Sequence, residues 1–263
     1  MRRETARTAL AAAAVLAAAA APAQALAPYT AVYRLEKNGL TLASLTRRLE
    51  VAGDRWRLEQ RAEPRGLATW WVDAHIEESS EFTLDADGRP RPLRYRLRHS
   101  DAERAAKDDL ALDFDHGAGR LCRRRGHGPV ECQPLEGRVY DPLTLQLALR
   151  LDAAAGAEEL HYRVADEDGI DERRFQVAPD GALPCPKRPC ATVLVSGERG
   201  SRRTAWWLGV ELDHLPLRIR QWRRDRLRAE LSLETVERPA PPPAEAGGSV
   251  SDGAPPASAG AVR

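Results

Sequence analysis

Long apolar runs are scarce in this 263-residue chain. The longest lies near the N-terminus, between Ala9 and Ala21, and it is shorter than the roughly 20 residues that a membrane-spanning helix needs. No later stretch of the sequence reaches that length. The sequence therefore predicts no transmembrane segment.

Neither sign of charge dominates the chain. It contains 40 Lys and Arg residues against 39 Asp and Glu residues, a formal net charge of +1. Such a balance gives no general argument for nucleic acid or an anionic membrane as a partner, and we predict no nucleic-acid partner. Lysine occurs only at Lys37, Lys107 and Lys187. We interpret the arginine bias as GC-rich codon use rather than as a phosphate-binding feature.

Motifs that identify a catalytic or metal site are also missing. None of the six histidines lies in an HExxH pattern, no serine occupies a GxSxG elbow, and there is no CxxC pair. We predict no catalytic residue, no cofactor and no metal. The sequence leaves open a hydrolytic triad assembled from distant parts of the fold.

Two groups of carboxylates stand close together in the sequence, one around Glu77, Glu78 and Glu81 and one at residues 166–168. Because adjacent strand residues face opposite sides of a sheet, we expect most of these carboxylates to diverge and to be solvated. Glu78 is the exception, since it shares its phase with apolar strand residues and is predicted to point into the interior.

The N-terminus has the pattern of an export signal. Arg2 and Arg3 precede the apolar run, and Ala23-Gln24-Ala25 is a small-x-small cleavage site. We expect cleavage after Ala25 and a periplasmic mature chain. No cysteine follows the cleavage site, so we expect no lipid anchor.

The segment from Pro239 to Arg263 is rich in Pro, Ala, Gly and Ser and has no aromatic residue. Such a composition cannot bury enough apolar surface to offset the entropy of ordering the chain. We predict a signal peptide over residues 1–25, a single β-rich domain over residues 26–238, and a disordered tail over residues 239–263.

The four cysteines form two sequence-local pairs, Cys122 with Cys132 and Cys185 with Cys190. In an exported chain this favours disulfides over a metal site. Of the three possible connectivities we predict the local one, with the Cys122–Cys132 disulfide bracing a hairpin.

Alternation of apolar and polar residues predicts about a dozen antiparallel strands between Tyr29 and Leu233. Asn38-Gly39 separates the first two runs and is a strong type I′ hairpin signal. A slip in the apolar phase of the second run predicts a bulge near Ala43-Ser44. So many strands must curl to protect their edges.

One segment breaks the two-residue pattern. Asp141 can cap a helix and Pro142 suits its first turn. Five leucines between residues 143 and 151 form a broad apolar stripe, which leaves Thr144, Gln146 and Arg150 for a polar side. The predicted fold is mainly β, an antiparallel meander curled into a barrel or half-open barrel with one long helix packed on or in it.

Several short motifs occur in a recognisable order. They are YTAVY at 29–33, WRL at 56–58, RPLRY at 91–95, LDFD at 112–115, DPLTLQLA at 141–148 and LPLRI at 215–219. Together they resemble an exported bacterial family defined as domain of unknown function 3108. The resemblance implies a fold similar to the half-open barrels of periplasmic lipoprotein carriers, and it implies no catalytic residue.

Six residues are candidates for lining an apolar ligand cavity: Tyr33, Trp56, Tyr95, Leu147, Trp206 and Trp207. Consecutive strand residues face opposite sides, so one of the last two lies inside and its neighbour outside. The alternative is that these side chains fill a core.

We predict a non-catalytic periplasmic module that binds or carries a lipid, another hydrophobic small molecule or an acyl-bearing partner. The rival hypothesis is a structural or assembly protein of the envelope with a filled core, which binds another protein. An enzyme is a third class for which the sequence offers no motif.

Deletion of residues 239–263 should leave the melting temperature almost unchanged, because a disordered tail contributes no buried contacts. Differential scanning calorimetry of the full-length and shortened chains checks this expectation. A loss of more than a few degrees would mean that the tail docks on the domain.

Overall fold

The computed structural model describes residues 26–65, 75–185 and 188–239. The expected signal peptide and the tail beyond Pro239 lie outside these residues. The strands are β1 (Tyr29–Lys37), β2 (Leu40–Ala52), β3 (Arg55–Pro64), β4 (Ile76–Leu84), β5 (Pro90–His99), β6 (Leu110–Asp115), β7 (Arg120–Arg125), β8 (Val130–Pro134), β9 (Val139–Tyr140), β10 (Glu159–Asp166), β11 (Gly169–Leu183), β12 (Cys190–Arg199), β13 (Arg202–Gly209), β14 (Leu215–Arg223) and β15 (Arg226–Glu237). The helices are α1 (Ala102–Asp108), α2 (Pro142–Ala154) and the 3-10 turn η2 (Val210–Leu212).

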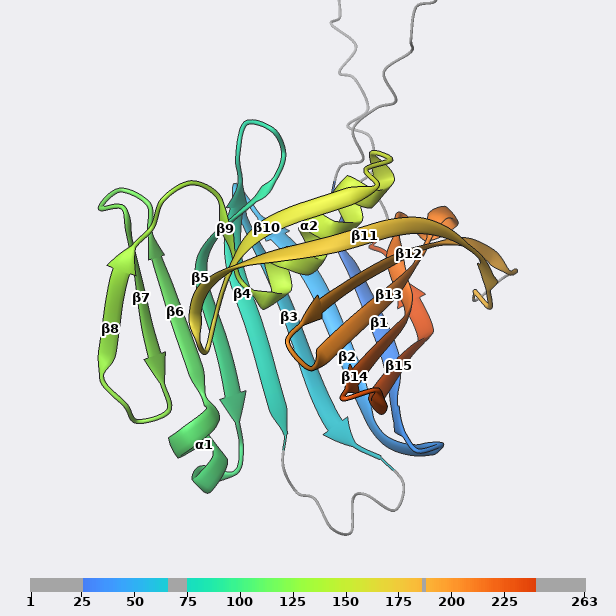
Figure 1. Ribbon diagram of the computed structural model, residues 1–263, viewed down its shortest axis with the longest axis horizontal. Coiled ribbons are helices and arrows are strands. Elements are labelled where there is room, and N and C mark those ends of the chain that lie inside the picture. The colour runs from blue at the N-terminus through green and yellow to red at the C-terminus, as the bar shows by residue number, and fades with distance from the viewer. Residues whose placement is uncertain (1–25, 66–74, 186–187, 240–263) are drawn as a thin grey trace, which may run out of the picture.

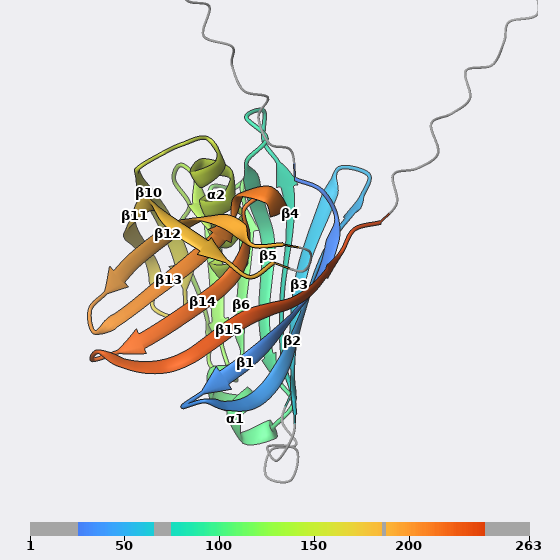
Figure 2. The same cartoon turned by 90° about the vertical axis from the view of Figure 1, so that its right-hand side faces the viewer.

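These strands form one sheet in the order β8-β7-β6-β5-β4-β3-β2-β1-β15-β14-β13-β12-β11-β10-β9. Neighbouring strands are antiparallel except β9 and β10, and the pairing of β1 with β15 brings the first and last strands together. The sheet curls around α2, as Figures 1 and 2 show, and its free edges are β8 and β9. It does not close, so of the two predicted architectures the open one describes the fold.

The first hairpin follows the sequence closely. Asn38 and Gly39 both have positive φ, at 53° and 77°, as a type I′ turn requires. The register shifts between the Leu35–Ala43 and Glu36–Thr41 pairs, which leaves Leu42 unpaired. The bulge therefore lies at Leu42, one residue before its predicted position.

The prediction of one long helix is wrong. Two short α-helices are present among the described residues, and the longer, α2, has 13 residues. Its start is as predicted: the side chain of Asp141 accepts hydrogen bonds from the backbone N–H groups of Leu143 and Thr144, at 2.8 and 2.9 Å. It ends where Gly156 adopts a φ of 81°, a left-handed conformation that breaks the helix.

Helix α2 is buried more completely than its sequence indicates. Leu143 and Leu147 join a core cluster with β1–β7, whereas Leu145 and Leu149 join a second cluster with β10–β13. The expected polar side is not a solvated face. Thr144 is fully buried in the capping box, and Arg150, only 7% exposed, donates a hydrogen bond to the carbonyl oxygen of Asp213.

Both disulfides have the predicted local connectivity. Cys122 on β7 lies directly opposite Cys132 on β8, with Cα atoms 4.1 Å apart, so this bond braces a hairpin. Cys185 pairs with Cys190 at a Cα distance of 5.7 Å. Within the described ranges there is no helix of the length and apolar character that crossing a membrane requires.

Leu147→Asp should destabilise the protein far more than Gln146→Asp, because Leu147 is 1% exposed between the helix and the sheet while Gln146 retains solvent access. Leu147→Ala should cost about 2–5 kcal/mol of unfolding free energy, the range for a filled core. Urea denaturation of the three variants measures these values. Equal effects of the two aspartates would show that α2 is not packed in this way.

Candidate functional site

A cavity of about 490 Å³ opens on the concave side of the sheet beside the first turns of α2. Helix residues line one wall, Tyr95 of β5 contributes to the lining, and strands β11–β15 supply the remaining wall. The sheet curls over α2 without closing (Figure 2). The cavity is partly open to solvent.

The apolar wall of the cavity comes from both core-facing strands and the helix. The rings of Phe175 and Trp206 meet edge to face, with centroids 5.7 Å apart, and Leu145 of α2 contributes to the same lining. Gly197 lies opposite Phe175 in the β11–β12 register. A Cβ atom at Gly197 would overlap the Phe175 ring, so glycine at this position leaves the space that the ring occupies against β12.

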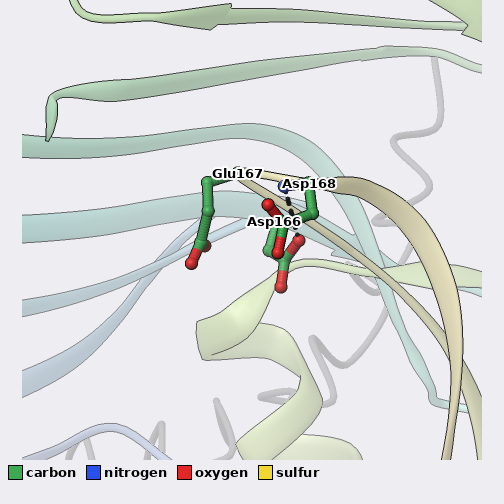
Figure 3. Close-up of side chains that lie close together, drawn as sticks. All are labelled: Asp166, Glu167 and Asp168. Atoms are coloured by element: carbon green, nitrogen blue, oxygen red, sulfur yellow. Dashed lines mark hydrogen bonds between the residues drawn. The ribbon is translucent and has the colours of Figure 1, made fainter. Parts of the chain in front are cut away.

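Acidic residues converge at one end of the cavity, at the turn between β10 and β11. One carboxylate oxygen from each of Asp166, Glu167 and Asp168 lies within 4.8 Å of the others (Figure 3). The expectation that these carboxylates diverge is wrong, because they occupy a tight turn rather than a straight strand. Nor is Asp166 solvated, since its side chain is only 5% exposed.

Arginines from neighbouring strands neutralise this acidic turn. Arg173 contacts Asp166, and Arg199 contacts Asp166 at 2.6 Å and Asp168 at 3.1 Å. Burial opposes the charged form of Arg199, but the neighbouring carboxylates outweigh it and raise the pKa of its guanidinium. The turn is thus an internal ion-pair network whose cations are arginine side chains.

A second polar chain crosses the concave face near Tyr95. The hydroxyl of Tyr95 donates to Glu78 at 2.6 Å, Gln60 donates to the other Glu78 oxygen, and Arg47 donates to Gln60 at 2.7 Å. The prediction that Glu78 points inward is confirmed. Burial raises the pKa of Glu78, although these hydrogen bonds and the charge of Arg47 act in the opposite direction.

The six predicted cavity residues divide into three groups. Tyr33 and Leu147 are fully buried in the larger core cluster, and Trp56 packs against it. Tyr95, also in that cluster, and Trp206 line the cavity. Trp207 faces the other side of β13, where its indole N–H donates to Asp180.

Sequence reasoning missed the charged part of the cavity. Its lining includes several arginines of β11–β15, among them Arg173, Arg199, Arg202 and Arg223. Each follows the two-residue alternation of its own strand, and this alternation could have predicted which face of the sheet the side chain lies on. Their meeting at one site depends on strand pairings that no local pattern reveals.

Two histidine rings have hydrogen-bond partners in the described part of the chain. The ring of His99 lies 3.1 Å from a carboxylate oxygen of Asp109, and that of His116 lies 2.6 Å from the carbonyl oxygen of Pro92. Neither ring is hydrogen-bonded to a serine, threonine or cysteine side chain there. These contacts connect β5 to the residues just before and just after β6.

Comparison with known proteins agrees with this architecture. Residues 28–226 match the family described as protein of unknown function DUF3108, and the chain belongs to that family. A crystal structure described as a β-barrel-like protein of domain of unknown function DUF1849, from Brucella abortus, is similar in fold. The TM-score is 0.54 and the identity 15%, over 81% of this chain and 98% of that chain. No curated protein matches the sequence.

Glu78→Gln should change how stability depends on pH. The unfolded chain ionises Glu78 near the ordinary pKa of 4.5, whereas the folded chain keeps its carboxyl protonated to higher pH. At pH values between the pKa of Glu78 in the unfolded chain and its higher pKa in the folded chain, the folded state binds more protons. The contribution of Glu78 to the free energy of unfolding therefore falls as pH rises. The wild-type value minus that of Glu78→Gln should therefore decrease above about pH 4.5.

Urea denaturation of both proteins across a pH series measures that difference. Glu77→Gln is the matched control, because Glu77 is the adjacent residue on the outer face, 3.2 Å from Arg61. A difference that rises with pH would mean that Glu78 is ionised in the folded protein throughout the range.

Proposed function

We propose that this DUF3108 family member is a non-catalytic periplasmic binding or carrier module whose ligand occupies the concave cavity beside α2. The cavity itself carries the proposal. Its volume of about 490 Å³ lies within the roughly 300–1,000 Å³ of small-molecule sites. It combines an aromatic wall with a few polar groups, as such sites do.

The apolar part of the ligand lies against Trp206, Phe175 and Leu145. Beyond these side chains the interior is occupied by the two core clusters on either side of α2. The space therefore suits one short apolar chain or ring system rather than several long acyl chains. This supports a lipophilic ligand of modest size.

Two further observations support the proposal. Two disulfides are stable in an oxidising compartment, which is compatible with export to the periplasm. The structural neighbour shares the barrel-like fold, and its likeness supports the architecture alone.

The filled core around α2 favours a second candidate, an envelope assembly protein that binds another protein. Edge strand β8 supports it, because a free edge can accept a strand from a partner. Val130 at the start of β8 is 62% exposed. In this case the cavity would hold no small molecule.

Native mass spectrometry of the full chain purified from a bacterial periplasm tests the first proposal. The expected result is a population with the added mass of a lipid-like molecule. Trp206→Ala should lose most of that population, because it removes a large aromatic side chain from the cavity wall.

Trp207→Ala is the matched control, since the same ring is removed from the opposite face of β13. It should keep the bound molecule. A clean apo mass for the wild type, with a co-purifying protein, would instead support the assembly role. Equal loss in both tryptophan variants would place the ligand outside the cavity.

A further inference from the structure

Four arginines lie directly opposite one another across the hairpin ends of β12–β15. The pairing register sets Arg199 against Arg202, Arg202 against Arg223, and Arg223 against Arg226. Adjacent strands are about 4.8 Å apart, so like charges are held close together along this row. Opposed like charges in a sheet are destabilising. We call these four residues the arginine row.

Only one end of the arginine row is well neutralised. Arg199 pairs with the acidic turn, and Arg202 reaches Glu167 at 3.7 Å. Arg223 and Arg226 form no ion pair with any described residue. The acidic residues in the same hairpin tips, Glu198 and Asp225, also form none within the described ranges.

The rest of the sheet shows that arginine richness does not by itself produce such a row. On the outer face, Arg57 pairs with Glu59 and with Glu81 on the neighbouring strand, and Arg94 lies 3.5 Å from Asp113. There the cross-strand register sets opposite charges side by side. In the arginine row the register does the reverse, which costs stability unless an anion is present.

The arginine row borders the proposed ligand cavity. Arg199, Arg202 and Arg223 line that cavity together with Trp206. Nearby, the guanidinium of Arg203 lies 4.3 Å from the ring centre of Trp222, which also lines it. Positive charge and apolar surface therefore occur in one space, with the charge concentrated toward the hairpin tips.

We propose that the arginine row binds the anionic group, a phosphate or a carboxylate, of an amphiphile whose apolar part lies against Trp206. Guanidinium groups suit this role because they donate paired hydrogen bonds to phosphate and carboxylate oxygens. The inference rests on the proposed function and names the chemical class of its ligand. The anion removes the repulsion that the pairing register imposes.

Tryptophan fluorescence titration of the full chain tests the proposal with three probes: dodecyl phosphate below its micelle concentration, dodecanol, and inorganic phosphate. Dodecyl phosphate should bind at least about tenfold more tightly than dodecanol, the change expected from one or two charge-assisted contacts. The double variant Arg202→Gln/Arg223→Gln should lose that advantage and leave dodecanol binding unchanged.

The double variant Arg98→Gln/Arg124→Gln is the matched control, since both arginines are exposed on β5 and β7 and lack an ion pair in the described structure. It should bind all three probes as the wild type does. Equal affinity for dodecyl phosphate and dodecanol would overturn the anion site and leave the proposed function standing. If neither dodecyl phosphate nor dodecanol binds, both the anion site and the proposed function are overturned.

The titration with inorganic phosphate distinguishes two sources of the anion, the headgroup of an amphiphile and free phosphate. An affinity for inorganic phosphate equal to that for dodecyl phosphate would mean a free-phosphate site and would overturn the headgroup assignment.

A measurement without ligand tests the repulsion itself. Arg223→Gln should raise the melting temperature by about 1–2 °C at low ionic strength. A fall in the melting temperature of Arg223→Gln would show that the arginine row is not repulsive.

Discussion

The buried carboxylate of Asp141 joins the helix to the sheet. One oxygen accepts hydrogen bonds from the first turn of α2, and the other accepts one from the hydroxyl of Ser80 on β4, at 2.6 Å. Burial raises the pKa of Asp141, which is the electrostatic cost of placing an acid there. The hydrogen bonds offset part of that cost and hold the helix across the concave face.

The position of α2 determines the rest of the interior. Its leucines contribute to both core clusters, so both halves of the sheet pack against the same helix. A sheet that encloses a helix is wider than one filled by side chains alone, and β8 and β9 remain apart. The space left beside the first turns of α2 is the candidate site. The helix thus both fills the half-barrel and sets the limits of its cavity.

Charge has different consequences on the two faces of the sheet. On the outer face, opposite charges are neighbours, and exposed pairs of this kind contribute little to stability but favour one register over another. On the concave face, the carboxylates of the acidic turn are paired with arginines, and Glu78 is hydrogen-bonded to Tyr95 and Gln60. The arginine row is the contrast, since its excess charge borders an accessible aromatic cavity. That combination of charge and aromatic surface is the basis on which we propose an anionic amphiphile as the ligand.

Local chemistry in the sequence determined much of this protein. Positive φ at Asn38-Gly39 requires a tight turn, Asp141-Pro142 starts a helix, and closely spaced cysteines pair with each other. Strand alternation even predicted the inward direction of Glu78. Each of these features depends on residues within a few positions of one another, and so a single sequence contains the necessary information.

Only the tertiary structure decided which distant residues meet. Arg150 lies on the nominally polar side of α2, yet the folding of the sheet over both sides of the helix buries it. Trp206 and Tyr95 share a cavity while Tyr33 lies in a filled core, because the curl of the sheet, not the strand pattern, sets that separation. The arginine row exists only through the register of four strands. Such pairings depend on long-range packing, which local periodicity does not encode.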